Sequence, residues 1–179
     1  MTTTSSPIPE TMRAAVLVAP GEPLQIQEIR TPRPKSHEVL VKVTACGLCH
    51  SDLHVIHGSI AFPTPAVLGH EVSGVIVEMG PDSQNSGLRV GQQVCGAFLM
   101  PCGTCPDCAR GRDDLCAPFF SLNRLKGQLF DGTSRLADLD GNTIAQYSMG
   151  GLAEYCVIPI TAVTAAPESL DPVASAILG

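Results

Sequence analysis

The chain has 179 residues, of which 44% are hydrophobic and 16% are charged, and its formal net charge is −6. This length supports one substantial core, and so apolar a composition argues against disorder. The acidic balance provides no basic stripe for phosphate backbones, so we expect no nucleic-acid partner. No apolar run is long enough to span a bilayer and the N-terminus lacks the order of a signal peptide, so we expect no membrane partner and a cytoplasmic location.

The N-terminal third of the chain predicts short strands. Residues 1–11 are rich in Thr, Ser and Pro without periodicity, which predicts a disordered tail before a single domain over 12–179. From Met12, two β-rich runs flank a Pro-Gly turn, which is typical of a hairpin. A further strand is predicted over 37–46.

The pattern continues beyond Cys49 with two predicted helical turns that stop at Gly58, and with a strand after His70. Gly74 inside that strand predicts a bulge or a close backbone approach. Residues 88–100 predict two strands interrupted at Gly91.

The second half of the chain is less regular. Residues 117–150 show little periodicity and predict an extended connection on the surface. Residues 150–159 predict a strand, and the Pro and acidic residues near the C-terminus predict a helix start. Many short strands at regular spacing predict a mainly β fold with short helices, arranged as a closed or partly open barrel.

One stretch concentrates groups that bind metals and move protons. Cys49 and His70 are the thiol and imidazole ligands that zinc accepts in a site left open for a reactant. Glu71 adds a carboxylate that is either a further ligand or a hydrogen-bond partner of a ligand. Ser51 and His54 place a hydroxyl and a titratable ring nearby, which indicates metal-assisted proton transfer.

A second cluster of metal ligands lies in a polar, Gly-rich loop within residues 99–117. Its four cysteines follow the spacing C-x2-C-x2-C-x7-C, which suits one tetrahedral zinc. An iron–sulfur cluster is the alternative, but the fourth cysteine comes late for that pattern and no Pro follows it directly. In a reducing compartment such clustered thiols indicate metal rather than disulfides. The predicted zinc ligands are Cys102, Cys105, Cys108 and Cys116.

These motifs resemble the N-terminal GroES-like catalytic domain of the zinc-containing medium-chain alcohol dehydrogenases. The resemblance runs from about Met12 to the last residue. It is most specific over 46–54, over 69–83 and in the four-cysteine lobe, and it extends to the segment 131–135.

The resemblance implies a role for each residue of the first cluster. Cys49 and His70 would hold a catalytic zinc, and Asp52 would be the partner of the metal-bound imidazole. Ser51 would accept the proton of the alcohol, and His54 would pass it to solvent by way of the cofactor ribose. Oxidation would then proceed through a zinc alkoxide and hydride transfer to NAD or NADP.

Three further residues match the family's cofactor and substrate positions. His50 would lie against the cofactor pyrophosphate, where a neutral imidazole grips less firmly than Arg. Ile60 and Phe98 would line the substrate pocket, and their alternative role is that of ordinary core residues.

The chain also departs from the family pattern. No G-x-G-x-x-G motif occurs, so no Rossmann domain is expected within this chain. The family's third catalytic-zinc ligand would follow a helix beginning near Leu170, which is where the chain stops. We therefore expect the zinc-binding half of a longer enzyme that acts on small-molecule alcohols or aldehydes, is a homo-oligomer only at full length, and is inactive without its Rossmann domain. The alternative is a stand-alone small zinc-binding protein or a zinc hydrolase.

Overall fold

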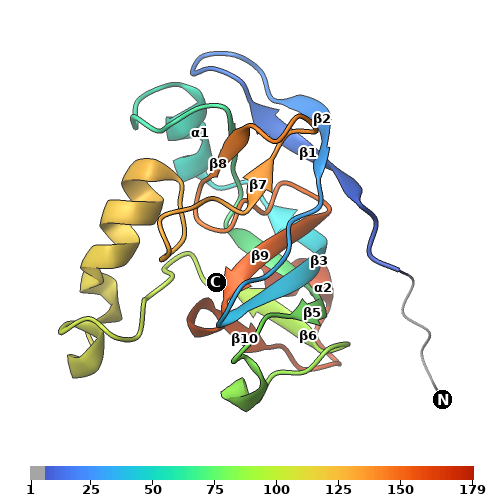
Figure 1. The fold of residues 1–179 in the computed structure, drawn as a ribbon, viewed down its shortest axis with the longest axis vertical. Coiled ribbons are helices and arrows are strands. Elements are labelled where there is room, and N and C mark those ends of the chain that lie inside the picture. The colour runs from blue at the N-terminus through green and yellow to red at the C-terminus, as the bar shows by residue number, and fades with distance from the viewer. Residues whose placement is uncertain (1–6) are drawn as a thin grey trace.

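Two five-stranded sheets form the frame of the computed structural model, which describes residues 7–179 (Figure 1). The first sheet has the order β2-β1-β4-β8-β7 and the second has the order β10-β6-β5-β3-β9. The strands of the first sheet are β1 (Thr11–Leu17), β2 (Gln25–Arg30), β4 (Ala66–Val67), β7 (Leu136–Ala137) and β8 (Thr143–Gln146). Those of the second are β3 (Glu38–Gly47), β5 (Glu71–Met79), β6 (Gln93–Gly96), β9 (Tyr155–Pro159) and β10 (Val163–Ala165).

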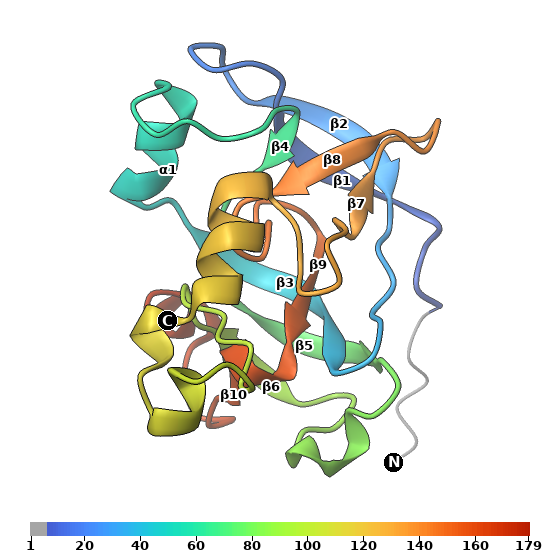
Figure 2. The same cartoon turned by 60° about the vertical axis from the view of Figure 1, so that its left-hand side comes forward.

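Helices in the described region are short and lie around the two sheets (Figures 1 and 2). The α-helices are α1 (His50–Ile56) and α2 (Pro172–Ala176), and η4 (Phe119–Arg124) is π-wound. The 3-10 turns are η1 (Gln84–Ser86), η2 (Cys108–Arg110), η3 (Asp113–Leu115) and η5 (Ile160–Ala162). None of the helices in residues 7–179 has the length and apolarity needed to cross a membrane.

The predicted mainly β fold with short helices is confirmed, and so are most of its elements. β1 and β2 form the expected antiparallel hairpin, in which Thr11 pairs with Arg30. β3, β5 and β9 appear where strands were predicted, and α1 follows Cys49 as expected. The C-terminal helix begins with Asp171, whose side chain accepts the Val173 N–H, and with Pro172 in its first turn.

The hydrophobic core fills the space between the two sheets. Both sheets contribute fully buried side chains, such as Val16 from β1, Leu40 from β3 and Ile158 from β9. A second cluster beneath α1 contains Leu17 and Tyr147. Burial of such side chains is the main stabilising term of the domain, about 1.5–3 kcal/mol for each large one.

Gly74 allows β5 to approach β3 closely, as predicted. A Cβ atom at Gly74 would lie 2.2 Å from the carbonyl oxygen of Lys42. The register of the β3–β5 pair shifts between Val43 and Ala45, opposite this position. Any side chain larger than hydrogen would therefore push the two central strands of the second sheet apart.

The prediction of two strands over residues 88–100 is wrong. Only β6 forms there, because the chain turns at Gly91, whose φ of +84° lies in the left-handed region. The Gly91 N–H donates to the carbonyl of Ile76 and the Ile76 N–H donates to the carbonyl of Gln92, so the turn stays bonded to β5 without forming a second strand.

The prediction of a surface connection over residues 117–150 is also wrong. This segment contains η4 as well as β8, and β8 lies inside the first sheet between β4 and β7. A π-wound turn does not repeat every 3.6 residues, so its buried Phe119 and Asn123 give no α-helical pattern. The β4–β8 pairing is parallel and only two residues long, which is too short to produce an alternation.

The predicted tail falls partly outside the described structure, because residues 1–6 are not described. Within the rest of it, Ile8 is partly buried against the core, and the Glu10 carbonyl accepts the Thr31 N–H at 2.9 Å. The ordered part of the chain thus includes residues before β1.

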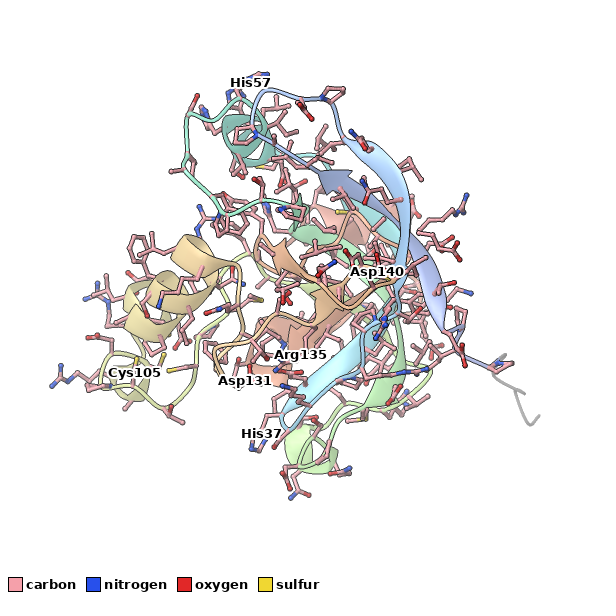
Figure 3. The ribbon with its side chains drawn as sticks, turned by 45° about the horizontal axis from the view of Figure 1, so that its top comes forward. His37, His57, Cys105, Asp131, Arg135 and Asp140 are labelled. Atoms are coloured by element: carbon pink, nitrogen blue, oxygen red, sulfur yellow. The ribbon has the colours of Figure 1, made fainter. Side chains whose placement is uncertain are left out.

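A network of ion pairs joins the start of β3 to the segment before β7 (Figure 3). Arg135 forms two hydrogen bonds with the buried carboxylate of Glu38, one of them Nε to Oε2 at 2.9 Å. Asp131 lies 3.1 Å from Arg135 Nη1 and 2.6 Å from Lys35 Nζ. Burial opposes ionisation of Asp131, but Lys35, Arg135 and Thr133 outweigh it and hold the pKa of this carboxyl well below its usual range.

Asp131→Asn should lower the free energy of unfolding at neutral pH by about 0.5–1 kcal/mol, a small value because the pair is partly exposed. A carboxyl with a depressed pKa in the folded state stabilises the protein above its unfolded pKa of about 4 and loses that effect as the pH falls. The difference from wild type should therefore shrink in acid, measured by urea unfolding at several pH values. Asp140→Asn, on a separate turn, is the control (Figure 3), and a pH-independent loss at Asp131 would contradict the assignment.

Candidate metal centres and active site

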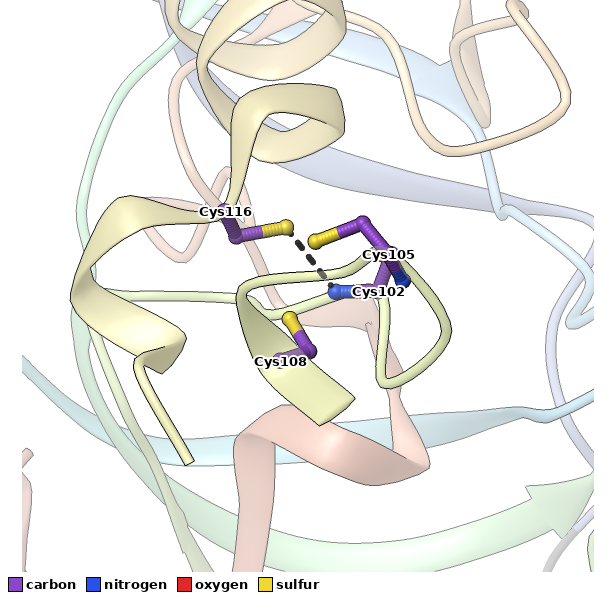
Figure 4. Close-up of side chains that lie close together, drawn as sticks. All are labelled: Cys102, Cys105, Cys108 and Cys116. Carbon is purple, nitrogen blue, oxygen red and sulfur yellow. Dashed lines mark hydrogen bonds between the residues drawn. The ribbon is translucent and has the colours of Figure 1, made fainter. Parts of the chain in front are cut away.

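Four sulfur atoms converge in the lobe between β6 and η4. Those of Cys102, Cys105, Cys108 and Cys116 all lie within 4.8 Å of one another (Figure 4). η2 carries Cys108, and η3 ends directly before Cys116, so two 3-10 turns bring the last two thiols back toward the first two. The arrangement fits one tetrahedral metal ion that is closed to other ligands.

Hydrogen bonds to sulfur prepare the lobe for a cation. Cys102 Sγ accepts the Cys105 N–H at 3.3 Å, and Cys116 Sγ accepts the Cys102 N–H at 3.2 Å. Burial opposes ionisation of Cys102, but the backbone and hydroxyl of Thr104 and the Cys105 N–H lower its pKa to about 6. Burial and the neighbouring sulfurs raise the pKa of Cys108 to about 12. The other sulfurs of the lobe would therefore ionise readily only with a bound cation, and four thiolates are a donor set that zinc accepts.

A second group of potential ligands forms where the two sheets meet. The side-chain ligand atoms of Cys49, His70 and Glu71 lie within 4.8 Å of one another. Cys49 is the N-cap of α1, just after β3 of the second sheet. His70 lies between β4 of the first sheet and β5 of the second, and Glu71 begins β5. The donor set is one that zinc accepts, so these residues fit a metal.

Asp52 connects the two ligand-bearing segments. Its carboxylate is fully buried and accepts the Cys49 N–H at 3.0 Å and the Gly69 N–H at 3.1 Å. Asp52 Oδ1 also lies 3.4 Å from His70 Nδ1. A carboxylate on that side of the ring favours a proton on Nδ1 and leaves Nε2 free to bind a metal.

Cys49 and His70 each favour the charged form of the other. Burial lowers the pKa of His70, but Asp52 and Cys49 outweigh it and raise that pKa above its ordinary value. Hydrogen bonds from the hydroxyl and the backbone of Ser51, followed by His70, lower the pKa of Cys49. Cys49 therefore has the thiolate character that a metal ligand requires.

Two glycines make room for this centre. A Cβ at Gly47 would lie 2.0 Å from Glu71 Oε2, so the carboxylate occupies the space that a side chain would take. Gly69 has a φ of +94°, and a Cβ there would lie 2.7 Å from the sulfur of Cys46. The role of Gly47 was not predicted from the sequence, because nothing in the local pattern links it to Glu71 on the neighbouring strand.

Ser51 and His54 lie differently with respect to the centre. Ser51 Oγ is 3.2 Å from His70 Nε2, the edge of the ring that would face a metal. His54 is exposed and its ring packs against that of His50, with centroids 4.7 Å apart. No hydrogen bond joins Ser51 to His54 in residues 7–179, so the hydroxyl lies beside His70 while the two imidazoles are exposed on α1.

Aromatic rings form one wall of the centre. The Phe98 ring is 4.5 Å from the His70 ring, and the Tyr147 ring is 5.9 Å from it. Ile60 is partly buried in the same apolar cluster as Phe98, under α1. Tyr147 is a wall residue that sequence analysis missed, because it lies in the segment predicted to be on the surface.

Comparisons with known proteins agree with this geometry. The family model described as "Alcohol dehydrogenase GroES-like domain" matches residues 35–168, and the chain belongs to this family. It is 38% identical over 155 residues to the "Alcohol dehydrogenase class-3" of Cereibacter sphaeroides, covering 84% of this chain and 40% of the relative. It is 42% identical over 123 residues to the "NDMA-dependent alcohol dehydrogenase" of Amycolatopsis methanolica, covering 69% of this chain and 32% of that protein.

A solved structure shows the same likeness. The alcohol dehydrogenase zinc-binding domain protein from Burkholderia ambifaria superimposes with a TM-score of 0.78 at 35% identity, over 89% of this chain and 42% of that one. The chain thus spans less than half the length of the relatives it matches.

The lobe should hold one metal ion that depends on all four thiols. Replacing Cys105 and Cys108 together by Ser should remove one zinc per chain, measured by elemental analysis of the purified protein, because a structural zinc site needs four ligands. Cys95→Ala, a buried thiol outside both clusters, is the control and should keep the full zinc content. A brown chromophore in the wild-type chain would instead indicate an iron–sulfur cluster.

Gly47→Ala should weaken metal binding at the second centre by about 10-fold or more, because the added Cβ displaces the Glu71 carboxylate. Affinity can be measured by competition with a chromophoric chelator. The four-cysteine lobe is the internal control and should keep its affinity in the same sample. If the metal affinity of the second centre were also unchanged, Glu71 would not be needed for metal binding there.

Proposed function

We propose that this chain is the zinc-binding catalytic part of an alcohol dehydrogenase that oxidises small-molecule alcohols with NAD or NADP as the hydride acceptor. The observation that carries the proposal is the convergence of Cys49, His70 and Glu71 beside the hydroxyl of Ser51. Membership of the alcohol dehydrogenase GroES-like family supports it.

Two zinc ions have different tasks in this proposal. The lobe holds one for stability, through the four sulfurs of Cys102, Cys105, Cys108 and Cys116. The other would be held by Cys49, His70 and Glu71, and when bound it would act as a Lewis acid that lowers the pKa of a hydroxyl beside it. Asp52 keeps the imidazole of His70 in the orientation that this task requires.

Ser51 is the residue best placed to take the proton of the alcohol. Its hydroxyl lies on the metal-facing edge of His70, and a hydroxyl there can accept one proton while it donates another. His54 is at the solvent side of the same helix, where it would release the proton to water. His50, also exposed, would face the cofactor pyrophosphate.

Hydride transfer requires a second part of the enzyme. Residues 7–179 contain no dinucleotide-binding Rossmann unit, and a nicotinamide has to be held against the substrate carbon for its hydride to be transferred. The cofactor would therefore bind to a separate Rossmann domain, for which the longer relatives have sufficient length. This chain would bind the metal and the alcohol and would take up the proton of the alcohol.

In a complete enzyme with these residues, Ser51→Ala should lower kcat by about 10²-fold or more, the usual size of a general-base effect. His54→Gln should cost much less, because water can replace a terminal group that is exposed. Steady-state kinetics with a primary alcohol and NAD or NADP measures both. Equal and negligible losses of kcat in the two variants would show that Ser51 and His54 do not form a proton relay.

The purified chain is the matching control. With zinc, NAD or NADP and a panel of primary alcohols it should form no NADH or NADPH, because the cofactor is not positioned. Hydrolysis of activated esters that is abolished by His70→Ala would favour a zinc hydrolase instead and would contradict the proposed function.

A further inference from the structure

Two histidines lie next to each other on the exposed side of α1. His50 is the first residue of the helix, His54 follows one turn later, and both residues are exposed. Side chains four positions apart lie on the same face of a helix. The two rings are accordingly neighbours, with centroids 4.7 Å apart. Within residues 7–179 neither ring makes a hydrogen bond or an ion pair, so both are free to bind a ligand from solvent.

The backbone that carries the two rings is fixed from the opposite side of the helix. Asp52 is fully buried there, and its carboxylate accepts two backbone N–H groups. Val55 is also buried, in the apolar cluster beneath α1. At the end of the helix the Ile56 carbonyl accepts the Gly21 N–H at 2.6 Å. The helix therefore holds the two imidazoles near each other without help from a ligand.

The geometry of the two rings suits one metal ion bound by both. An imidazole nitrogen binds a metal through a lone pair in the plane of its ring. Lone pairs in parallel planes cannot converge, but these rings are tilted by 59°. An ion about 2.0–2.1 Å from a ring nitrogen lies about 3.2 Å from the ring centroid, so centroids 4.7 Å apart correspond to an angle of about 95° at the ion.

This angle indicates the kind of ion. Neighbouring ligands of a square-planar or tetragonal ion subtend about 90°, and Cu(II) and Ni(II) adopt that geometry with nitrogen ligands. Two histidines at positions i and i+4 on one helix face are also the arrangement with which helical metal sites are built. We propose that His50 and His54 form a further metal site, outside both ligand clusters, that takes nickel(II) or copper(II) with water in the remaining positions.

His57 lies near this pair but does not belong to it. It is exposed at the C-terminal end of α1 (Figure 3). In the part of the chain that the structure describes, the ligand atoms of His50, His54 and His57 do not all lie within 4.8 Å of one another. His57 is therefore a matched control, since it has the same side chain on the same helix and lies outside the site.

An ion at this site would interfere with the roles that the proposed function gives to the two histidines. His50 would face the cofactor pyrophosphate and His54 would release the proton to water. An ion bound to both rings would hinder the first contact and block the second. This consequence rests on the proposed function, whereas binding of the ion by the two rings does not.

Calorimetric titration of the zinc-loaded chain with nickel(II) tests the inference; nickel is used because copper(II) oxidises thiols. One nickel ion should bind per chain. His50→Gln and His54→Gln should each lower the affinity by about 10-fold or more, because the second imidazole binds in an intramolecular step. The double variant should lose little more than either single one, since one lost ring already breaks the chelate.

His57→Gln should leave the nickel affinity unchanged. An unchanged zinc content in every variant, measured by elemental analysis, would show that these exposed substitutions do not disturb the fold or the other ligand clusters. Absence of nickel binding, or an affinity that His50→Gln or His54→Gln leaves unchanged, would overturn the inference. An equal loss in His57→Gln would also overturn it, because nickel would then be binding to surface histidines in general.

A complete enzyme with these residues separates this inference from the proposed function. Nickel should raise the KM for NAD or NADP there, because ion and cofactor compete for His50. If nickel binds the chain but leaves this KM unchanged, the metal site stands and the proposed cofactor contact of His50 fails. If nickel does not bind while alcohols are oxidised, the proposed function stands and this inference fails.

Discussion

The buried carboxylate of Asp52 is the contact on which the candidate active site depends. It accepts the N–H of Cys49 at the start of α1 and the N–H of Gly69 just before His70, and it lies beside the imidazole of His70. The Asp52 carboxylate thus connects the segment that follows β3 with the link between β4 and β5, where the chain passes from the first sheet to the second. Both N–H donors are satisfied and the charge is held in one place, so removal of the carboxylate would leave two segments without their common anchor.

The two metal centres are built on different principles. The lobe takes all its ligands from one short loop, and its own N–H groups turn the sulfurs inward. Its geometry therefore depends on local turns. The other candidate centre takes Cys49 from the N-cap of α1, His70 from the link between β4 and β5, and Glu71 from the start of β5, so it forms only when these distant segments are packed together. Loss of a metal from the lobe should disturb one surface loop, whereas any shift between the segments that carry Cys49, His70 and Glu71 would change the candidate active site directly.

The regular part of the fold could be predicted from sequence because its signals are local. The hairpin of β1 and β2 follows from two β-rich runs around a turn, and α1 follows from its start at Cys49 and its stop at Gly58. The four thiols of the lobe could be proposed as ligands from their spacing and residue type. The roles of Cys49 and His70 depended in addition on the resemblance to the alcohol dehydrogenase family.

The irregular part could not be predicted, because it depends on contacts between distant residues. The space for Glu71 is made by Gly47 on the adjacent strand, and β8 is held by two residues of β4. The π-turn η4 has no repeat that a pattern can detect, although Asn123 on it bonds to the backbone around Tyr147.

The candidate ligands and the aromatic wall beside them are thereby carried by different kinds of structure. The candidate metal ligands and Ser51 lie at junctions of regular strands and a helix, where hydrogen bonds to Asp52 and His70 hold them in place. The wall formed by Phe98, Tyr147 and Arg124 comes from irregular segments, which can change in length and sequence without moving the strands. A new residue on η4 would alter this wall and would leave the candidate ligands in place, because Asn123 of η4 bonds to the backbone around Tyr147. The aromatic wall of the candidate site can therefore change without a change in the candidate metal ligands.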